Sequence, residues 1–184
     1  MDGLKLKPGQ ENPFDNILYY FSAKVAPIFH KNKITPNQVT FFSFICSLLS
    51  MYYLYKKKYI YSALLWLLSY FFDCLDGYLA RKYKQFSKFG DLYDHISDIF
   101  SFILLLYIFD LKKKYKELRI IVVFIILTMI HISCQEKIYN KKKESLSLNS
   151  FNICPYHNMI KLTRWFGPGT LNLVIIMFIL RGDK

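Results

Sequence analysis

Four aspartates lie in long apolar stretches of this 184-residue sequence, where a charged side chain is costly. Asp73 and Asp76 are three residues apart and Asp94 and Asp98 are four apart, so in helices each pair shares one face. The connection between the pairs is short, so their helices can pack as antiparallel neighbours and bring the four carboxylates together. Such a cluster needs protons or divalent cations, and oxygen ligands suit Mg²⁺, Mn²⁺ or Ca²⁺. Two ions bridged by shared carboxylates are commonly used for displacement at phosphorus.

The residues around the aspartates favour a substrate that contains phosphate. Gly77 and Ala80 remove bulk from the same helix, so a large group can approach its backbone. Arg81 follows at the helix end and can form paired hydrogen bonds to a phosphate. A single intramembrane aspartate is often a structural hydrogen-bond partner, but four at these spacings indicate a functional site.

The elements that must position these residues are long apolar runs. Each of the first four is near the roughly 20 residues that a membrane-spanning helix needs. The fifth is short, and it spans only if its helix begins near Asn158 and bends at Gly167 and Pro168. We therefore expect an all-α, polytopic helical membrane bundle with about five spanning helices. The runs are residues 38–55, 59–81, 90–109, 119–138 and 168–180.

The N-terminal region differs from these runs. Residues 1–13 are polar and contain Pro8, Gly9 and Pro13, which predicts a flexible arm without the apolar core of a signal peptide. Residues 14–30 are mildly amphipathic and predict an interfacial helix lying along the membrane. We expect residues 14–184 to form one membrane domain, with a loop over residues 140–157.

Composition and charge agree with a membrane protein. Hydrophobic residues make up 53% of the chain, which excludes a disordered protein, and the formal net charge is +12. Because the basic residues lie between the apolar runs, this charge favours an anionic lipid surface and not nucleic acid. Basic residues are more abundant in the loops on the N-terminal side. The positive-inside rule therefore predicts a cytoplasmic N-terminus, and with it an active site on the cytoplasmic side.

The four cysteines form no CxxC pair, and we expect all of them to be reduced, structural thiols. They are Cys46, Cys74, Cys134 and Cys154. His131 with Cys134, and Cys154 with His157, have a spacing that occurs in zinc sites. The first pair falls within a predicted helix, however, so a zinc site is a minor alternative.

The acidic pattern carries a resemblance to a known family. Asp73-x2-Asp76-Gly77-x2-Ala80-Arg81-x8-Gly90-x3-Asp94-x3-Asp98 resembles the complete signature of the CDP-alcohol phosphotransferase family, also called the class I CDP-alcohol phosphatidyltransferases. Upstream, the segment Thr35-Pro36-Asn37-Gln38-Val39-Thr40 resembles the start of the family's first spanning helix. The resemblance covers residues 14–135.

The resemblance implies an integral membrane enzyme that cleaves a CDP-linked donor, releases CMP and joins the phosphoryl unit to an alcohol. It implies two ions, Mg²⁺ or Mn²⁺. Asp73, Asp76 and Asp94 would hold the first ion. Asp73, Asp94 and Asp98 would hold the second, and Asp98 would be the catalytic residue that accepts the proton of the incoming hydroxyl.

The same resemblance implies a set of donor-binding residues. Gly77, Ala80 and Arg81 would contact the CDP moiety, and Ser87 would reach the diphosphate region. The residues expected to border the nucleotide are Asn37, Gln38, Val39 and Thr40. The implied partners are the CDP-linked donor, the alcohol acceptor and membrane lipid, with a possible homodimer and no nucleic acid.

Substrate choice rests on two motifs that point in different directions. The segment from Gln85 to Gly90 resembles enzymes that use CDP-diacylglycerol, which we favour as the donor. Asp94 followed by His95 resembles the aminoalcohol phosphotransferases, which use CDP-choline or CDP-ethanolamine with diacylglycerol; His95 could equally orient a carboxylate. Family members typically have six spanning helices and this chain shows five runs, so a non-catalytic lipid-binding relative is another alternative. An intramembrane prenyltransferase fits the spacing less well, and a divalent-cation transporter is a further alternative because acidic intramembrane residues also line ion paths.

Overall fold

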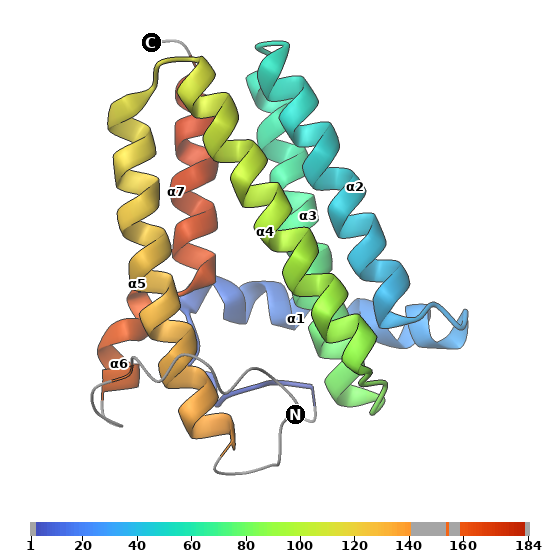
Figure 1. Cartoon of the computed structure of the whole chain (residues 1–184). Helices are drawn as coiled ribbons and strands as arrows, with labels where there is room; N and C mark the ends of the chain where they lie inside the picture. The colour runs from blue at the N-terminus through green and yellow to red at the C-terminus, as the bar shows by residue number, and fades with distance from the viewer. Residues whose placement is uncertain (1–2, 141–153, 155–158, 183–184) are drawn as a thin grey trace.

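A computed structural model describes residues 3–140, 154 and 159–182 of the chain (Figure 1). The first helix is followed by four long helices. A shorter helix, a 3-10 turn and a last helix then complete the bundle. These elements are α1 (Pro13–Lys31), α2 (Pro36–Tyr55), α3 (Tyr59–Lys82), α4 (Lys88–Leu111), α5 (Tyr115–Asn140), α6 (Ile160–Thr163), a 3-10 turn (Arg164–Phe166) and α7 (Pro168–Arg181). No strand occurs among the described residues. The predicted all-α fold is confirmed.

Within the described residues, five helical segments are long and apolar enough to cross a membrane: α2, α3, α4, Tyr115–Ile138 of α5, and Ile160–Arg181. Figure 1 shows α2–α5 and α7 as an upright bundle, with α1 lying crosswise at one end. The fifth segment is interrupted as its sequence predicts. Gly167 has an extended backbone with ψ at 176°, and Pro168 starts α7. Proline is favoured there because its missing N–H has no partner in a first turn.

Local sequence signals explain where the helices begin and how they turn. Thr35 and Gln38 form a reciprocal capping box at the start of α2. Asn12 caps α1 and Ser87 caps α4 through their side chains. The turns that follow the first four helices each contain one lysine in the left-handed conformation, with φ between 55° and 60°: Lys33, Lys57, Lys84 and Lys113.

Serine side chains join α2 to its neighbours. Ser43 and Ser69 lie 3.1 Å apart between their hydroxyl oxygens, and Ser50 and Ser62 repeat this contact between α2 and α3 at 3.1 Å. Ser47 reaches the hydroxyl of Ser101 on α4 at 2.7 Å. Small side chains let helix backbones approach closely, and a hydroxyl pair supplies a hydrogen bond where lipid offers none. These contacts hold α3 and α4 against the same helix.

The largest apolar cluster joins α2, α3, α4, α5 and α7 at the end of the bundle away from the aspartates. Leu105, Ile121, Ile175 and Ile179 are completely buried in it. Polar side chains gather at the opposite end, where α3 ends and α4 begins. Apolar packing therefore holds the helices together at one end, and the polar side chains at the other end are available for binding and catalysis.

Helix α1 has the two-sided character predicted for an interfacial helix. It buries Leu18 and Ala26 against the bundle and exposes Ile17, Tyr20 and Phe21 on its other side. A helix with one apolar face turned outward at the edge of a membrane bundle suits the lipid–water boundary.

Residues 3–12, predicted as part of a flexible arm, lie folded against the bundle. Leu6 is buried and packs with Cys134 and Ile160, and Glu11 and Asn12 are buried beside it. The domain boundary at residue 13 stays a prediction.

The expectation of four free thiols is wrong for two cysteines. Cys134 and Cys154 form a disulfide, with Cα atoms 5.0 Å apart, while Cys46 and Cys74 are free. Sequence spacing does not show that the chain after α5 folds back on that helix. The disulfide also removes the Cys134 thiolate from the zinc alternative, and the ring nitrogen Nδ1 of His131 instead lies 3.1 Å from the Thr163 hydroxyl. His157 lies outside the described residues.

Candidate active site

Helices α3 and α4 bring three of the predicted aspartates together. One carboxylate oxygen each from Asp73, Asp76 and Asp94 lies within 4.8 Å of the other two. Ligand oxygens lie about 2.0–2.6 Å from a bound Mg²⁺ or Ca²⁺, so oxygens on different sides of one ion are separated by up to about 5 Å. The three aspartates therefore fit a hard divalent cation.

Asp98 lies one helical turn beyond Asp94 on α4. It lines the same cavity as the other three aspartates but does not belong to their close group. The structure thus places three carboxylates at one ion-sized position and the fourth on the adjoining wall. This is the arrangement expected if one ion uses the first three aspartates and Asp98 faces the space beside it.

The cavity has a volume of about 290 Å³ and is lined by residues of six helices and of the segment before α1. Its lining includes Trp66, Phe102 and Asn172, and the indole nitrogen of Trp66 donates to Asn172 Oδ1 at 2.9 Å. It also includes the aspartates and charged side chains from α1, α4 and α5. A volume of this size holds a small polar molecule or the headgroup of a lipid.

Thr40 is the only one of the four residues expected to border the nucleotide that lines the cavity. Its hydroxyl donates to Asp76 Oδ2 at 2.6 Å, so it positions a candidate metal ligand. Val39 is completely buried in an apolar cluster with Leu75 and Leu79. Gln38 uses its side-chain oxygen to cap its own helix. The nucleotide contacts stay a prediction.

Arg81 lines the cavity and is held from two sides. Its Nε donates to the carbonyl oxygen of Gly3 at 2.8 Å, and its guanidinium carbon lies 5.7 Å from the centre of the Tyr19 ring. Its Nη2 is buried and has no hydrogen-bond partner among the residues that the structure describes. A Cβ atom on Gly77 would lie 3.0 Å from Nη1, so glycine leaves room for the guanidinium. Arg81 therefore presents an unused donor in a buried position.

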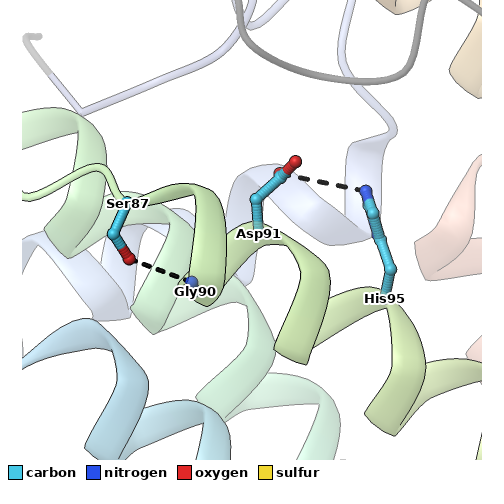
Figure 2. Close-up of polar contacts among 4 residues, drawn as sticks. All are labelled: Ser87, Gly90, Asp91 and His95. Atoms are coloured by element: carbon cyan, nitrogen blue, oxygen red, sulfur yellow. Dashed lines mark hydrogen bonds and ion pairs between the residues drawn. The ribbon is translucent and has the colours of Figure 1, made fainter.

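Ser87 and Gly90 shape the start of α4, as Figure 2 shows. The amide of Gly90 donates to Ser87 Oγ at 2.9 Å, which satisfies one of the free amides of the first turn. A Cβ atom on Gly90 would clash with this hydroxyl and with the side chain of Asn37. Gly90 therefore lets α2 and α4 meet closely. Neither Ser87 nor Ala80 lines the cavity, and their predicted donor contacts remain untested.

His95 pairs with an aspartate outside the group of three. Figure 2 shows its ring directed at Asp91, one turn earlier on α4, with Nε2 3.8 Å from Asp91 Oδ1. Both side chains are about two-fifths exposed, so this pair lies at the water-accessible edge. His95 also lines the cavity.

Several cavity residues were not found from the sequence. Gln135 on α5 donates to Glu11 at 2.5 Å, and the hydroxyl of Tyr70 donates to Asp15 Oδ1 at 2.5 Å. Burial raises the pKa of Asp15 to about 7 and also raises the pKa of Glu11. Burial lowers the pKa of Lys5, and the nearby Arg81 charge lowers it further, against the opposing effect of Glu136. No spacing rule links these residues, because they come from four separate segments, namely the residues before α1, α1, α3 and α5.

The sequence pattern of the CDP-alcohol phosphatidyltransferase family matches residues 33–181, which include all four aspartates and the helices that carry them. The chain belongs to this family.

Two named relatives share parts of the chain. An archaetidylinositol phosphate synthase of Pyrococcus horikoshii is 40% identical over 65 residues, 35% of each chain. A CDP-diacylglycerol–glycerol-3-phosphate 3-phosphatidyltransferase of Aquifex aeolicus is 34% identical over 85 residues, 45% of this chain and 48% of the relative. The matched region thus spans between about a third and a half of these curated relatives.

Proposed function

We propose that this protein transfers a substituted phosphate group from a CDP-linked lipid to an alcohol and releases CMP, in phospholipid synthesis. The observation that carries the proposal is the close group of Asp73, Asp76 and Asp94 beside a cavity lined by Asp98 and Arg81, in a member of this family. Carboxylate clusters of this kind hold the divalent ions that phosphorus chemistry uses.

In the proposed reaction, the alcohol oxygen attacks the lipid-side phosphorus of the donor and loses its proton to Asp98. The bond between this phosphorus and the bridging oxygen breaks, and CMP leaves with the electron pair. An alcohol is a weak nucleophile, so a positioned base is needed. Asp73, Asp76 and Asp94 would hold one Mg²⁺ or Mn²⁺ and Asp73, Asp94 and Asp98 a second, and bound ions neutralise charge on the phosphates and the leaving group.

Other residues of the chain support this step without reacting. Thr40 holds Asp76 in place through its hydroxyl. Arg81 offers the unpartnered N–H groups of Nη2 to a phosphate oxygen, and an arginine–phosphate hydrogen bond is strong in a buried site.

CDP-diacylglycerol is the donor that we favour. The Aquifex relative is named for this donor, and the segment from Gln85 to Gly90 resembles enzymes that use it. The competing reading, an aminoalcohol phosphotransferase with CDP-choline or CDP-ethanolamine, rests on His95 following Asp94. Since His95 pairs with Asp91 at the cavity edge, its position gives that reading no added support.

We place the active site on the cytoplasmic side because basic residues are more abundant in the loops at that end of the bundle. The Cys134–Cys154 disulfide lies at the same end and argues for the opposite side, because stable disulfides are more usual in oxidising compartments. We also propose that the protein forms a homodimer, as is common in the family.

The test is CMP release by purified protein with CDP-diacylglycerol and Mg²⁺ or Mn²⁺, across inositol, inositol phosphate, glycerol phosphate and serine. Acceptor-dependent CMP is expected, and Asp98→Asn should lower its rate by about 10² to 10⁴-fold through loss of the base. Asp110→Asn is the control, because Asp110 lies on the same helix but is exposed at its far end.

Each other outcome points to an alternative. No CMP with this donor, but CMP from CDP-choline or CDP-ethanolamine with diacylglycerol, would favour the aminoalcohol reading. No CMP from either donor class would indicate a non-catalytic relative.

A further inference from the structure

Two turns at the end of the bundle away from α1 and the aspartates have the same four residues (Figure 1). The α2–α3 turn is Lys56-Lys57-Lys58-Tyr59, and the α4–α5 turn is Lys112-Lys113-Lys114-Tyr115. The middle lysine has a φ of 60° in the first turn and 55° in the second. In both turns the amides of the three lysines donate to carbonyl oxygens of the preceding helix. The two turns are thus equivalent in sequence and in backbone structure.

The fold does not require three lysines in such a turn. The turns after α1 and α3 use the same left-handed conformation with one lysine each, Lys33 and Lys84, between residues of other types. Lys58 is the N-cap residue of α3, and its side chain makes no capping hydrogen bond in the described part of the chain. A cation at a helix N-terminus is unfavourable, because it opposes the helix dipole. Local stability therefore does not explain the repeated lysines.

The two turns adjoin each other. The Nζ atom of Lys112 lies 5.7 Å from the centre of the Tyr59 ring, so the second turn contacts the first. A Cβ atom on Gly182, at the end of α7, would lie 2.8 Å from the same ring. Tyr59 therefore packs against the second turn and the end of α7. We call the six lysines of the two turns the six-lysine surface.

This surface is strongly positive. Lys56, Lys58 and Lys113 are exposed and form no ion pair with the residues that the structure describes. The carboxylates described at this end of the bundle are those of Asp110 and Glu117. Further positive charge at this end comes from Lys116, Arg119 and Arg181. Positive charge thus far exceeds negative charge among the described residues here, and the surface is complementary to an anion.

The surrounding tyrosines indicate that this anion belongs to a lipid. Tyrosine gathers where the apolar core of a bilayer meets the headgroups. The candidate spans α2, α3 and α4 begin or end at the two turns, so the lysines lie at the level of the lipid phosphates. A cluster of lysines at this level attracts anionic lipids, and each lysine adds to the attraction. The exposed tyrosines near the turns are Tyr52, Tyr55, Tyr61, Tyr107 and Tyr115.

We propose that the six-lysine surface binds the headgroups of anionic phospholipids in the leaflet opposite the aspartates. The inference does not rest on the proposed transferase function, because it concerns the other end of the bundle. Membrane orientation does not explain these lysines either. With the active site on the cytoplasmic side, they lie on the side where the positive-inside rule disfavours lysine.

Lipid binding to the purified protein in neutral detergent tests the proposal. The wild-type protein should bind a fluorescent phosphatidylglycerol at least about tenfold more tightly than the matching phosphatidylcholine. About 1 M NaCl should abolish this preference, because it screens charges beyond about 3 Å. A variant with three exposed lysines replaced should bind phosphatidylglycerol at least about tenfold more weakly. Its substitutions are Lys56→Gln, Lys58→Gln and Lys113→Gln.

The matched control removes three exposed lysines from the other end of the bundle, and like the test variant it includes one left-handed lysine. It should bind phosphatidylglycerol as the wild-type protein does. Its substitutions are Lys31→Gln, Lys84→Gln and Lys88→Gln. Arginine at the three test positions should preserve binding, since it keeps the charge. Equal melting temperatures without lipid would show that the substitutions leave the fold intact.

Three results would overturn the inference. One is equal phosphatidylglycerol affinity in the test and control variants. Another is equal affinity of the wild-type protein for phosphatidylglycerol and phosphatidylcholine, a comparison that needs no variant. The third is displacement of the lipid by inorganic phosphate, which would make the six-lysine surface a site for soluble anions.

Discussion

Thr40 and Asp76 come from different helices, α2 and α3, and a hydrogen bond of 2.6 Å joins their side chains. The hydroxyl fixes the orientation of the Asp76 carboxylate, which belongs to the group with Asp73 and Asp94. Thr40→Val keeps the shape but removes the donor, so metal affinity should fall about 10- to 100-fold, as is usual when a group that orients a metal ligand is lost. The Mn²⁺ concentration for half-maximal CMP release measures this.

Thr40→Ser is the matched control, because it retains the hydroxyl and should stay near the wild-type Mn²⁺ requirement. Equal Mn²⁺ requirements for Thr40→Val and the wild-type protein would show that the hydrogen bond does not position a ligand.

Asp15 predicts a pH dependence of stability. Burial raises its pKa from 3.8 to about 7 in the folded protein. Between these values the folded state binds a proton that the unfolded state has lost, so the free energy of unfolding falls as the pH rises. Above about pH 7 both states are ionised and the slope disappears. At about 1.4 kcal/mol per pKa unit, the free energy of unfolding falls by on the order of a few kcal/mol across this pH range.

Asp15→Asn removes this titration and leaves an acceptor for the Tyr70 hydroxyl. The free energy of unfolding should be measured in detergent from about pH 5 to 8 for both proteins. The wild-type value should fall relative to the variant value as the pH rises to about 7, and the difference should then stay constant. A difference that does not change with pH would show that Asp15 keeps an ordinary pKa.

At this scale the sequence revealed the four aspartates because regular helix geometry links residues three and four apart. It did not reveal the Thr40–Asp76 bond or the place of Asp15 and Lys5. Those contacts join residues far apart in the chain, and their partners are set by how helices pack.

Among the elements, the junction of α1 and α7 depends on one glycine. Asn12 donates to the carbonyl of Arg164 at 2.7 Å and to the Thr170 hydroxyl at 2.8 Å. A Cβ atom on Gly169 would lie 2.6 Å from Asn12 Oδ1 and would also clash with the Asp15 carboxylate. Gly169→Ala should therefore destabilise the protein by about 1–3 kcal/mol, despite the better helix propensity of alanine.

Gly9→Ala provides the control, because a Cβ atom at Gly9 would meet nothing within 4 Å. Thermal unfolding in detergent should show a lower melting temperature for Gly169→Ala alone. Equal melting temperatures for both variants would mean that α1 and α7 adjust at little cost.

Helix lengths, their five candidate spans and the break at Gly167 and Pro168 followed from apolar runs and proline placement. The fold of residues 3–12 and the Cys134–Cys154 disulfide did not. Polar, glycine- and proline-containing segments carry no periodic signal, so their structure depends on contacts that the neighbouring helices supply.

The molecule as a whole combines an apolar end that holds α2–α5 and α7 together with a polar end that six helices and the N-terminal segment enclose. Five candidate spans occur among the described residues, where six are typical of the family. The cavity is nonetheless walled on the α1 side by Lys5, Glu11 and Asp15. The crosswise α1 and the segment before it thus form one wall of the cavity.

The most direct test of the central claim is CMP release after divalent ions have been removed with a chelator and Mn²⁺ has been added back. The account predicts no release without the ion, full recovery with it in the wild-type and Asp110→Asn proteins, and no recovery in Asp73→Asn, whose carboxylate belongs to the ion-sized group. Release that persists without divalent ions, or that Mn²⁺ restores equally in Asp73→Asn, would contradict it.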